Sequence, residues 1–130
     1  MVPYGVKEPA NDTERLRVSV SDDIRYQLVL LAGSRRTRTS IFSAARPTHW
    51  EPASVRRPDT GEAFTPDGAW TFVADLLERG IAVDTIVLDK PPGRTGYVVL
   101  CDGWVGEKIY IKLELCSGIV VGRSFHVSTR

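Results

Sequence analysis

Apolar and polar residues alternate strictly over residues 108–115, where every odd position from Ile109 to Leu115 is aliphatic. A period of two is typical of a β-strand with one buried face. A second, largely apolar run follows at 119–127, after the short connection Cys116-Ser117-Gly118. The glycine in this connection favours a tight turn. The pattern therefore predicts a β-hairpin with one aliphatic face and one polar face.

The length of the connection decides which residues of the two strands face each other. A three-residue loop brings Leu113 opposite Val121, so that large apolar groups meet across the ladder, with Gly118 left-handed. A two-residue loop brings Leu113 opposite Gly122, and a slip of one residue moves side chains to the wrong face. We therefore expect the three-residue loop. The polar-face pairs are then Lys112–Gly122, Tyr110–Ser124 and Lys108–His126.

Arg123 is out of step with this register, because strict alternation directs its side chain inward beside Ile111. A β-bulge at Gly122 turns Arg123 back to the polar face. Bulges often contain glycine and are frequent beside active sites. Such a bulge is the interpretation that reconciles Arg123 with the hairpin.

Two helices are predicted ahead of the hairpin. Ser21 is a favourable N-cap for a helix over 22–32, which carries two aspartates in its first turn. Thr65 caps a second helix that begins at Pro66 and stops before Gly80. Apolar stripes at helical spacing support both. These stripes comprise Ile24, Leu28 and Leu31 in the first helix and Trp70, Val73, Leu76 and Leu77 in the second.

Shorter apolar runs predict further strands at 16–20, 85–88 and 96–100. The proline-rich residues 44–63 are interpreted as an irregular crossing segment, and residues 1–13 as a flexible tail. The remainder, 14–130, is expected to form one α+β domain. Its two main helices pack on one face of a largely antiparallel sheet of about four to five strands.

Composition narrows the classes of function. Seventeen Lys and Arg against sixteen Asp and Glu leave a net charge of +1, so nucleic-acid binding has to come from a local patch. The two cysteines, Cys101 and Cys116, have no Cys-x-x-Cys spacing, which argues against a metal site or a disulfide framework. Neither a long apolar span nor a signal peptide is visible. We expect a cytoplasmic protein without a cofactor or a membrane partner.

Three motifs occur in order along the chain: Leu88-Asp-Lys-Pro-Pro-Gly-Arg-Thr-Gly-Tyr97, Ile109-Tyr-Ile-Lys112 and Gly122-Arg-Ser-Phe-His126. Their order, after a helix, resembles the bacterial toxins of the motility quorum-sensing regulator type (MqsR), which belong to the RelE-like mRNA interferases. The resemblance covers residues 64–127 and leaves 14–63 as an added N-terminal region. It implies a RelE-like fold and a type II toxin that cuts messenger RNA without a metal. It also implies an antitoxin protein as partner, with the ribosome as a further candidate.

The resemblance carries site residues onto this chain by position. The strand tyrosine of the family falls on Tyr110 and the neighbouring lysine on Lys112. The basic residue after the Ser-Phe pair falls on His126, where some members carry lysine. The lysine that precedes the central strands falls on Lys90.

The chemistry of RNA cleavage supports these residues independently of the family. Attack by the 2′-hydroxyl needs a base, cations that stabilise the charge developing on phosphorus, and an acid for the leaving oxygen. His126 is the candidate base or acid because histidine titrates near neutrality. Lys112 and Arg123 are candidates for holding the phosphate, and Tyr110 for stacking or hydrogen bonding to RNA. The predicted contacts to the RNA backbone are Lys90, Arg94 and Lys108.

Each of these residues also has a structural interpretation. His126 fits a solvated surface histidine, Tyr110 fits cross-strand packing, and Lys112 with Glu114 fits a solvated strand face. His49-Trp50 is interpreted as structural, with the indole anchoring the irregular segment. Nucleotide-binding and hydrolase motifs are missing from the sequence. Two functions remain: a metal-independent messenger-RNA endoribonuclease, or a non-catalytic module that binds RNA or a protein partner.

Overall fold

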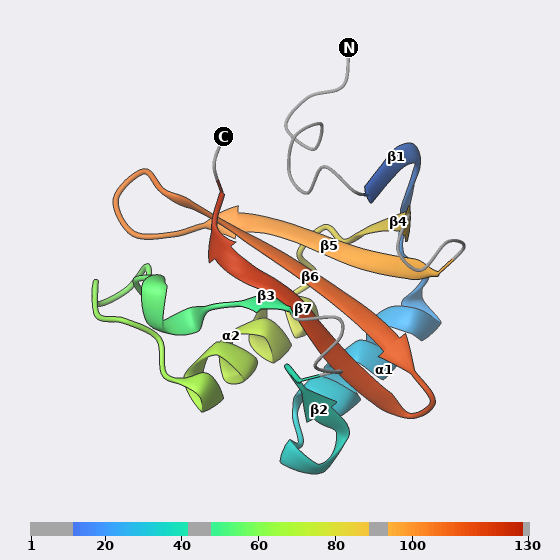
Figure 1. The fold of residues 1–130 in the computed structure, drawn as a ribbon, viewed down its shortest axis with the longest axis horizontal. Coiled ribbons are helices and arrows are strands. Elements are labelled where there is room, and N and C mark those ends of the chain that lie inside the picture. The colour runs from blue at the N-terminus through green and yellow to red at the C-terminus, as the bar shows by residue number, and fades with distance from the viewer. Residues whose placement is uncertain (1–11, 42–47, 89–93, 129–130) are drawn as a thin grey trace.

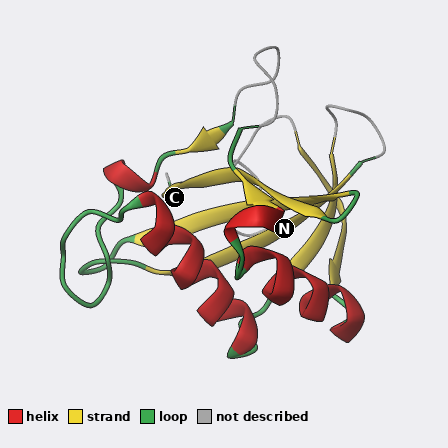
Figure 2. Ribbon diagram, turned by 90° about the horizontal axis from the view of Figure 1, so that it is seen from below, coloured by secondary structure: helices red, strands yellow, loops and turns green. Residues whose placement is uncertain are grey.

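A computed structural model of the chain describes residues 12–41, 48–88 and 94–128. It is an α+β fold in which two helices lie on the same side of a seven-stranded sheet (Figures 1 and 2). The helices are α1 (Asp22–Ala32) and α2 (Pro66–Glu78). The strands are β1 (Asp12–Ser19), β2 (Arg38–Thr39), β3 (His49–Trp50), β4 (Asp84–Leu88), β5 (Thr95–Asp102), β6 (Lys108–Cys116) and β7 (Ile119–Val127). Most of the predicted tail, Lys90 and the Pro91-Pro-Gly93 segment lie outside the described residues.

The strands follow the order β1-β4-β5-β6-β7-β2, and β3 also pairs with β7. Pairing from β1 to β7 along this path is antiparallel, whereas β2 and β3 run parallel to β7. The expected α+β class and largely antiparallel sheet are therefore confirmed. The expected count of four to five strands was too low. The extra strands β2 and β3 have two residues each, which is too short for an alternating pattern to predict them from the sequence.

Both helices begin and end where the sequence predicts. The Ser21 hydroxyl accepts a hydrogen bond from the backbone N–H of Ile24 (3.2 Å), and the Thr65 hydroxyl accepts one from Gly68 (2.9 Å). Each cap satisfies one of the free N–H groups of a first helical turn. Past the end of α2, Gly80 adopts a left-handed φ of 92°, which glycine tolerates without strain. Helix boundaries are therefore local properties of this chain.

Within the described residues, no helix combines the length and apolar character that crossing a bilayer requires.

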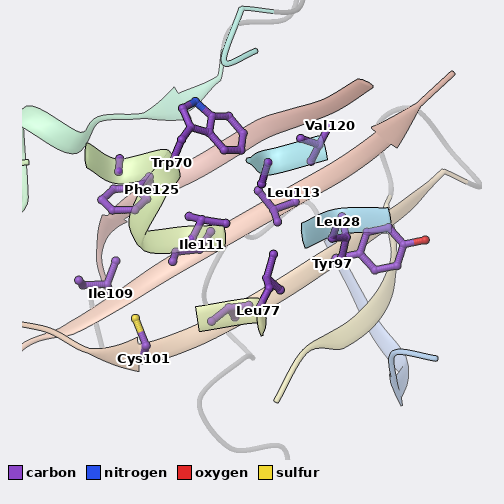
Figure 3. Close-up of a cluster of buried hydrophobic side chains, with 14 of the residues drawn as sticks. Leu28, Trp70, Leu77, Tyr97, Cys101, Ile109, Ile111, Leu113, Val120 and Phe125 are labelled. Carbon is purple, nitrogen blue, oxygen red and sulfur yellow. The ribbon is translucent and has the colours of Figure 1, made fainter. Parts of the chain in front are cut away.

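The main core lies between the helices and the adjoining face of the sheet (Figure 3). Leu28 of α1 and Leu77 of α2 are fully buried there, together with Ile111 of β6 and Phe125 of β7. Full burial of one such side chain contributes about 1.5 to 3 kcal/mol. We call this side of the sheet the helix face and the opposite side the outer face.

Trp50 of β3 connects the edge of the sheet to this core. Its ring stacks on Trp70 of α2, with 4.5 Å between centroids, and contacts Phe125 at 5.2 Å. The indole also lies directly over Gly122, where an added Cβ would come within 2.5 Å of ring carbon. The structural role expected for Trp50 is thus confirmed, and it requires a residue without a side chain on β7.

We expect Gly122→Ala to lower the free energy of unfolding by about 1 to 3 kcal/mol, because the new methyl group overpacks the site against the indole. Urea denaturation of purified protein measures the change. The double variant Gly122→Ala with Trp50→Leu provides the control, since removing the indole abolishes the clash. A double variant whose loss equals the sum of the two single losses would show that no clash exists.

Cys101 on β5 belongs to the core (Figure 3), and burial raises the pKa of its thiol to about 12. The thiol is therefore protonated and unreactive in the folded protein at mildly alkaline pH. Both cysteines are free, and Cys116 is only half-buried.

We expect iodoacetamide to modify Cys116 alone in the native state and both cysteines after unfolding, as read by mass spectrometry. Equal rates of modification in the native protein would contradict this assignment.

Candidate functional site

The β6–β7 hairpin turns through two residues, so the expected three-residue loop was wrong. Ser117 and Gly118 both have positive φ, 43° and 81°, as a two-residue hairpin turn requires. Leu113 accordingly lies opposite Gly122. In this pairing the glycine gives Leu113 no apolar partner across the ladder. In the structure the Trp50 ring of a third strand fills the space over Gly122.

A β-bulge is present next to Gly122, as expected, but its effect differs from the predicted one. With the two-residue turn Arg123 already follows Gly122 onto the outer face, and the bulge brings Ser124 to that face as well. Leu113 pairs with Gly122 while Lys112 pairs with Ser124, which leaves Arg123 as the extra residue. Two neighbouring residues of a bulge can point to the same side of a sheet. The Arg123 side chain indeed reaches Glu114 on the outer face, with 2.7 Å between Nη1 and Oε1.

The shorter turn and the bulge each move the register by one residue, so every pair beyond the bulge is displaced by two residues from the predicted one. Tyr110 lies opposite His126, whereas the sequence-based register paired Tyr110 with Ser124 and Lys108 with His126. The two rings stack, with 5.4 Å between centroids and 29° between planes. His126 Nδ1 lies 3.0 Å from the carbonyl oxygen of Val127. Because a carbonyl only accepts, Nδ1 carries the proton of the neutral ring and Nε2 is left as the acceptor.

Tyr110 and Lys112 are buried on the outer face, with 2% and 6% of their surface exposed. The interpretation of Lys112 and Glu114 as a solvated strand face was therefore wrong. Tyr110 packs in a small apolar cluster with Ile86, Leu88 and Val98, so the structural interpretation of this tyrosine as a cross-strand packing residue is confirmed. The half-buried His126 is the most accessible member of the pair of rings. A ligand from solvent reaches His126 before Tyr110.

Glu114 lies at the centre of an ion cluster that sequence reasoning missed. Its carboxylate is 1% exposed and contacts Arg123 through Oε1 and Arg94 through Oε2, at 2.7 and 2.5 Å. The Arg94 contact is an ion pair without hydrogen-bond alignment, and Arg94 Nη2 also donates to Cys116 Sγ at 3.0 Å. One buried carboxylate thus holds two arginines from separate parts of the sheet. The signal in the sequence that pointed to this cluster was Arg123, a charged residue that did not fit the predicted register of the hairpin.

The structure brings some of the predicted site residues together on the outer face and places others elsewhere. Those that share the central outer face are Arg94, Tyr110, Lys112, Arg123 and His126. Lys108 lies at the start of β6, where its ammonium pairs with Asp102 at 2.5 Å and is largely exposed. Lys90 lies outside the described residues. Among the residues that the structure does describe, no three His, Cys, Asp or Glu side chains gather as metal ligands.

His49 is a further residue of this face that sequence reasoning did not select. It precedes Trp50 on β3 and pairs with Ser124 of β7. Since successive residues of a strand point to opposite faces, a core-facing Trp50 directs His49 outward. The side chain of His49 is exposed. Only the parallel pairing of a two-residue strand reveals this position, and no sequence period marks it.

We expect Glu114→Ala to destabilise the protein by about 3 to 5 kcal/mol, because it leaves the nearly buried Arg123 without its counter-charge. The matched control is Asp75→Ala, which removes the exposed ion pair with Arg79 on α2 and changes stability by less than about 1 kcal/mol. Urea denaturation of both variants makes the comparison. Equal, small losses would show that Glu114 is not a buried organising charge.

Compared with known protein families, with curated proteins and with solved structures, the chain matches none.

Proposed function

We propose that this protein is a metal-independent endoribonuclease of messenger RNA, a toxin of the MqsR type with a RelE-like fold. The observation that carries the proposal is the pairing of His126 with Tyr110 on the outer face, one row from Lys112. The bulge at Arg123 is what brings these residues into adjacent rows. His126 offers a base and Lys112 a cation for the reaction, and an aromatic ring such as Tyr110 serves RNA binding by stacking.

The proposed reaction begins at the half-buried His126. With Nδ1 held at the Val127 carbonyl, Nε2 accepts the proton of a ribose 2′-hydroxyl as its oxygen attacks phosphorus. Lys112 and the arginine pair at Glu114 supply positive charge as negative charge develops on the phosphate oxygens. The bond from phosphorus to the 5′-oxygen breaks, and this oxygen takes a proton from a general acid. The products are a 2′,3′-cyclic phosphate and a free 5′-hydroxyl.

The partners follow from this proposal. Messenger RNA is the substrate in the cytoplasm, either free or on the ribosome. An antitoxin protein silences the toxin by denying RNA access to His126 on the outer face.

A second candidate function is a non-catalytic module that binds RNA or a protein partner. The burial of Tyr110 and Lys112 favours it, because both side chains already have partners within the fold. In that case the same face contributes charge and shape without chemistry.

Incubation of a labelled messenger RNA with purified protein in excess EDTA tests the proposal. We expect discrete new ends with wild type and a rate at least about 100-fold lower with His126→Ala, because the general base is lost. Arg79→Ala, an exposed arginine on α2, is the control and retains activity. Intact RNA with wild type, both in EDTA and in a translation reaction, would contradict the proposal and favour the binding module.

A further inference from the structure

The chain contains two histidines, and the sheet brings both to its outer face. His49 on β3 lies opposite Ser124 of β7. The next pair is Trp50 and Phe125, whose rings contact each other on the helix face with 5.2 Å between their centroids. His126 lies two residues beyond Ser124 on the same strand. Residues two apart on a strand point to the same side, so His126 shares the face of His49.

The register sets the distance between the two histidines. A strand spacing of about 4.8 Å and a rise of about 3.3 Å per residue place their Cα atoms roughly 8 Å apart. Ser124, small and buried, lies at the corner between them. On its other side Ser124 pairs with Lys112 of β6. The two imidazoles therefore lie on one face on either side of Ser124, with the buried Lys112 in the neighbouring strand.

Other charged groups adjoin Ser124. Lys112 borders it from β6 and Arg123 from the bulge of β7, where Glu114 holds the guanidinium. Glu51 follows β3 directly, and its backbone N–H donates to the Phe125 carbonyl at 3.0 Å. That hydrogen bond continues the pairing of β3 past Trp50, which keeps His49 tied to the strand that carries His126.

We propose that His49 and His126 are an acid–base pair for RNA cleavage, an inference that rests on the proposed function. The 2′-oxygen bonds to phosphorus while its proton passes to Nε2 of His126. The bond from phosphorus to the 5′-oxygen then breaks, and the imidazolium of His49 gives that oxygen a proton. No oxidant or reductant is consumed. Histidine suits both roles because it exchanges its proton near neutral pH.

The first test is the pH dependence of kcat/KM for cleavage of a short RNA. Wild type gives a bell-shaped profile. His49→Ala lowers kcat by about 100-fold and removes the fall at high pH, whereas His126→Ala removes the rise from low pH. Thr39→Ala, on the neighbouring strand β2, leaves the profile unchanged. A merely structural role for His49 would lower the rate without changing the shape of the profile.

The second test does not depend on cleavage. With two histidines in the chain, NMR resolves one ring Cε1–H signal for each. A single-stranded 2′-deoxy oligonucleotide, which binds but cannot react, is expected to shift both signals with one dissociation constant. A shift of the His126 signal alone overturns the pair.

The outcomes separate the two proposals. If wild type cuts RNA and His49→Ala cuts it equally well, the histidine pair is overturned and the proposed function stands. If wild type cuts no RNA, alone or in a translation reaction, both proposals fall.

Discussion

The contact between the Trp50 indole and Gly122 is the constraint on which the rest of this structure depends. The ring occupies the space that a side chain on β7 would need, so glycine is required there. The same ring stacks on Trp70 of α2, which ties the short strand β3 to the core. The register of the hairpin, the bulge at Arg123 and the position of His49 all meet at this contact. A residue of a short edge strand is thereby packed against the bulged part of the central hairpin.

Burial on both faces distinguishes β6 from an ordinary hairpin strand. Its helix face packs Ile109, Ile111 and Leu113 against the helices, and its outer face buries Tyr110, Lys112 and Glu114. A buried carboxylate is costly unless it is paired, and two arginines meet that need. The polar side chains of this strand are therefore buried, and the carboxylate of Glu114 is paired within the fold. Such fixed charges are suited to electrostatic stabilisation, because they need little reorganisation when a phosphate acquires charge.

The candidate site combines one rigid and one accessible component. Tyr110, Lys112 and Ser124 form a buried floor, while His49 and His126 reach solvent. The accessible histidines come from adjacent parallel strands, which are joined by backbone pairing and by the packing of Trp50 on Phe125. Whether the face cleaves RNA or only binds a partner, the same packing defines which side chains it presents.

Sequence alone determined the local features of this protein. The caps at Ser21 and Thr65 and the alternation along β6 are encoded within a few neighbouring residues, and each is predicted from the sequence. Only the tertiary structure decided the turn length, the burial of Lys112 and Glu114, and the strands β2 and β3. The physical reason is that these features depend on residues distant in sequence. Trp50 fills the space over Gly122 from more than seventy positions away, and no local pattern contains that contact.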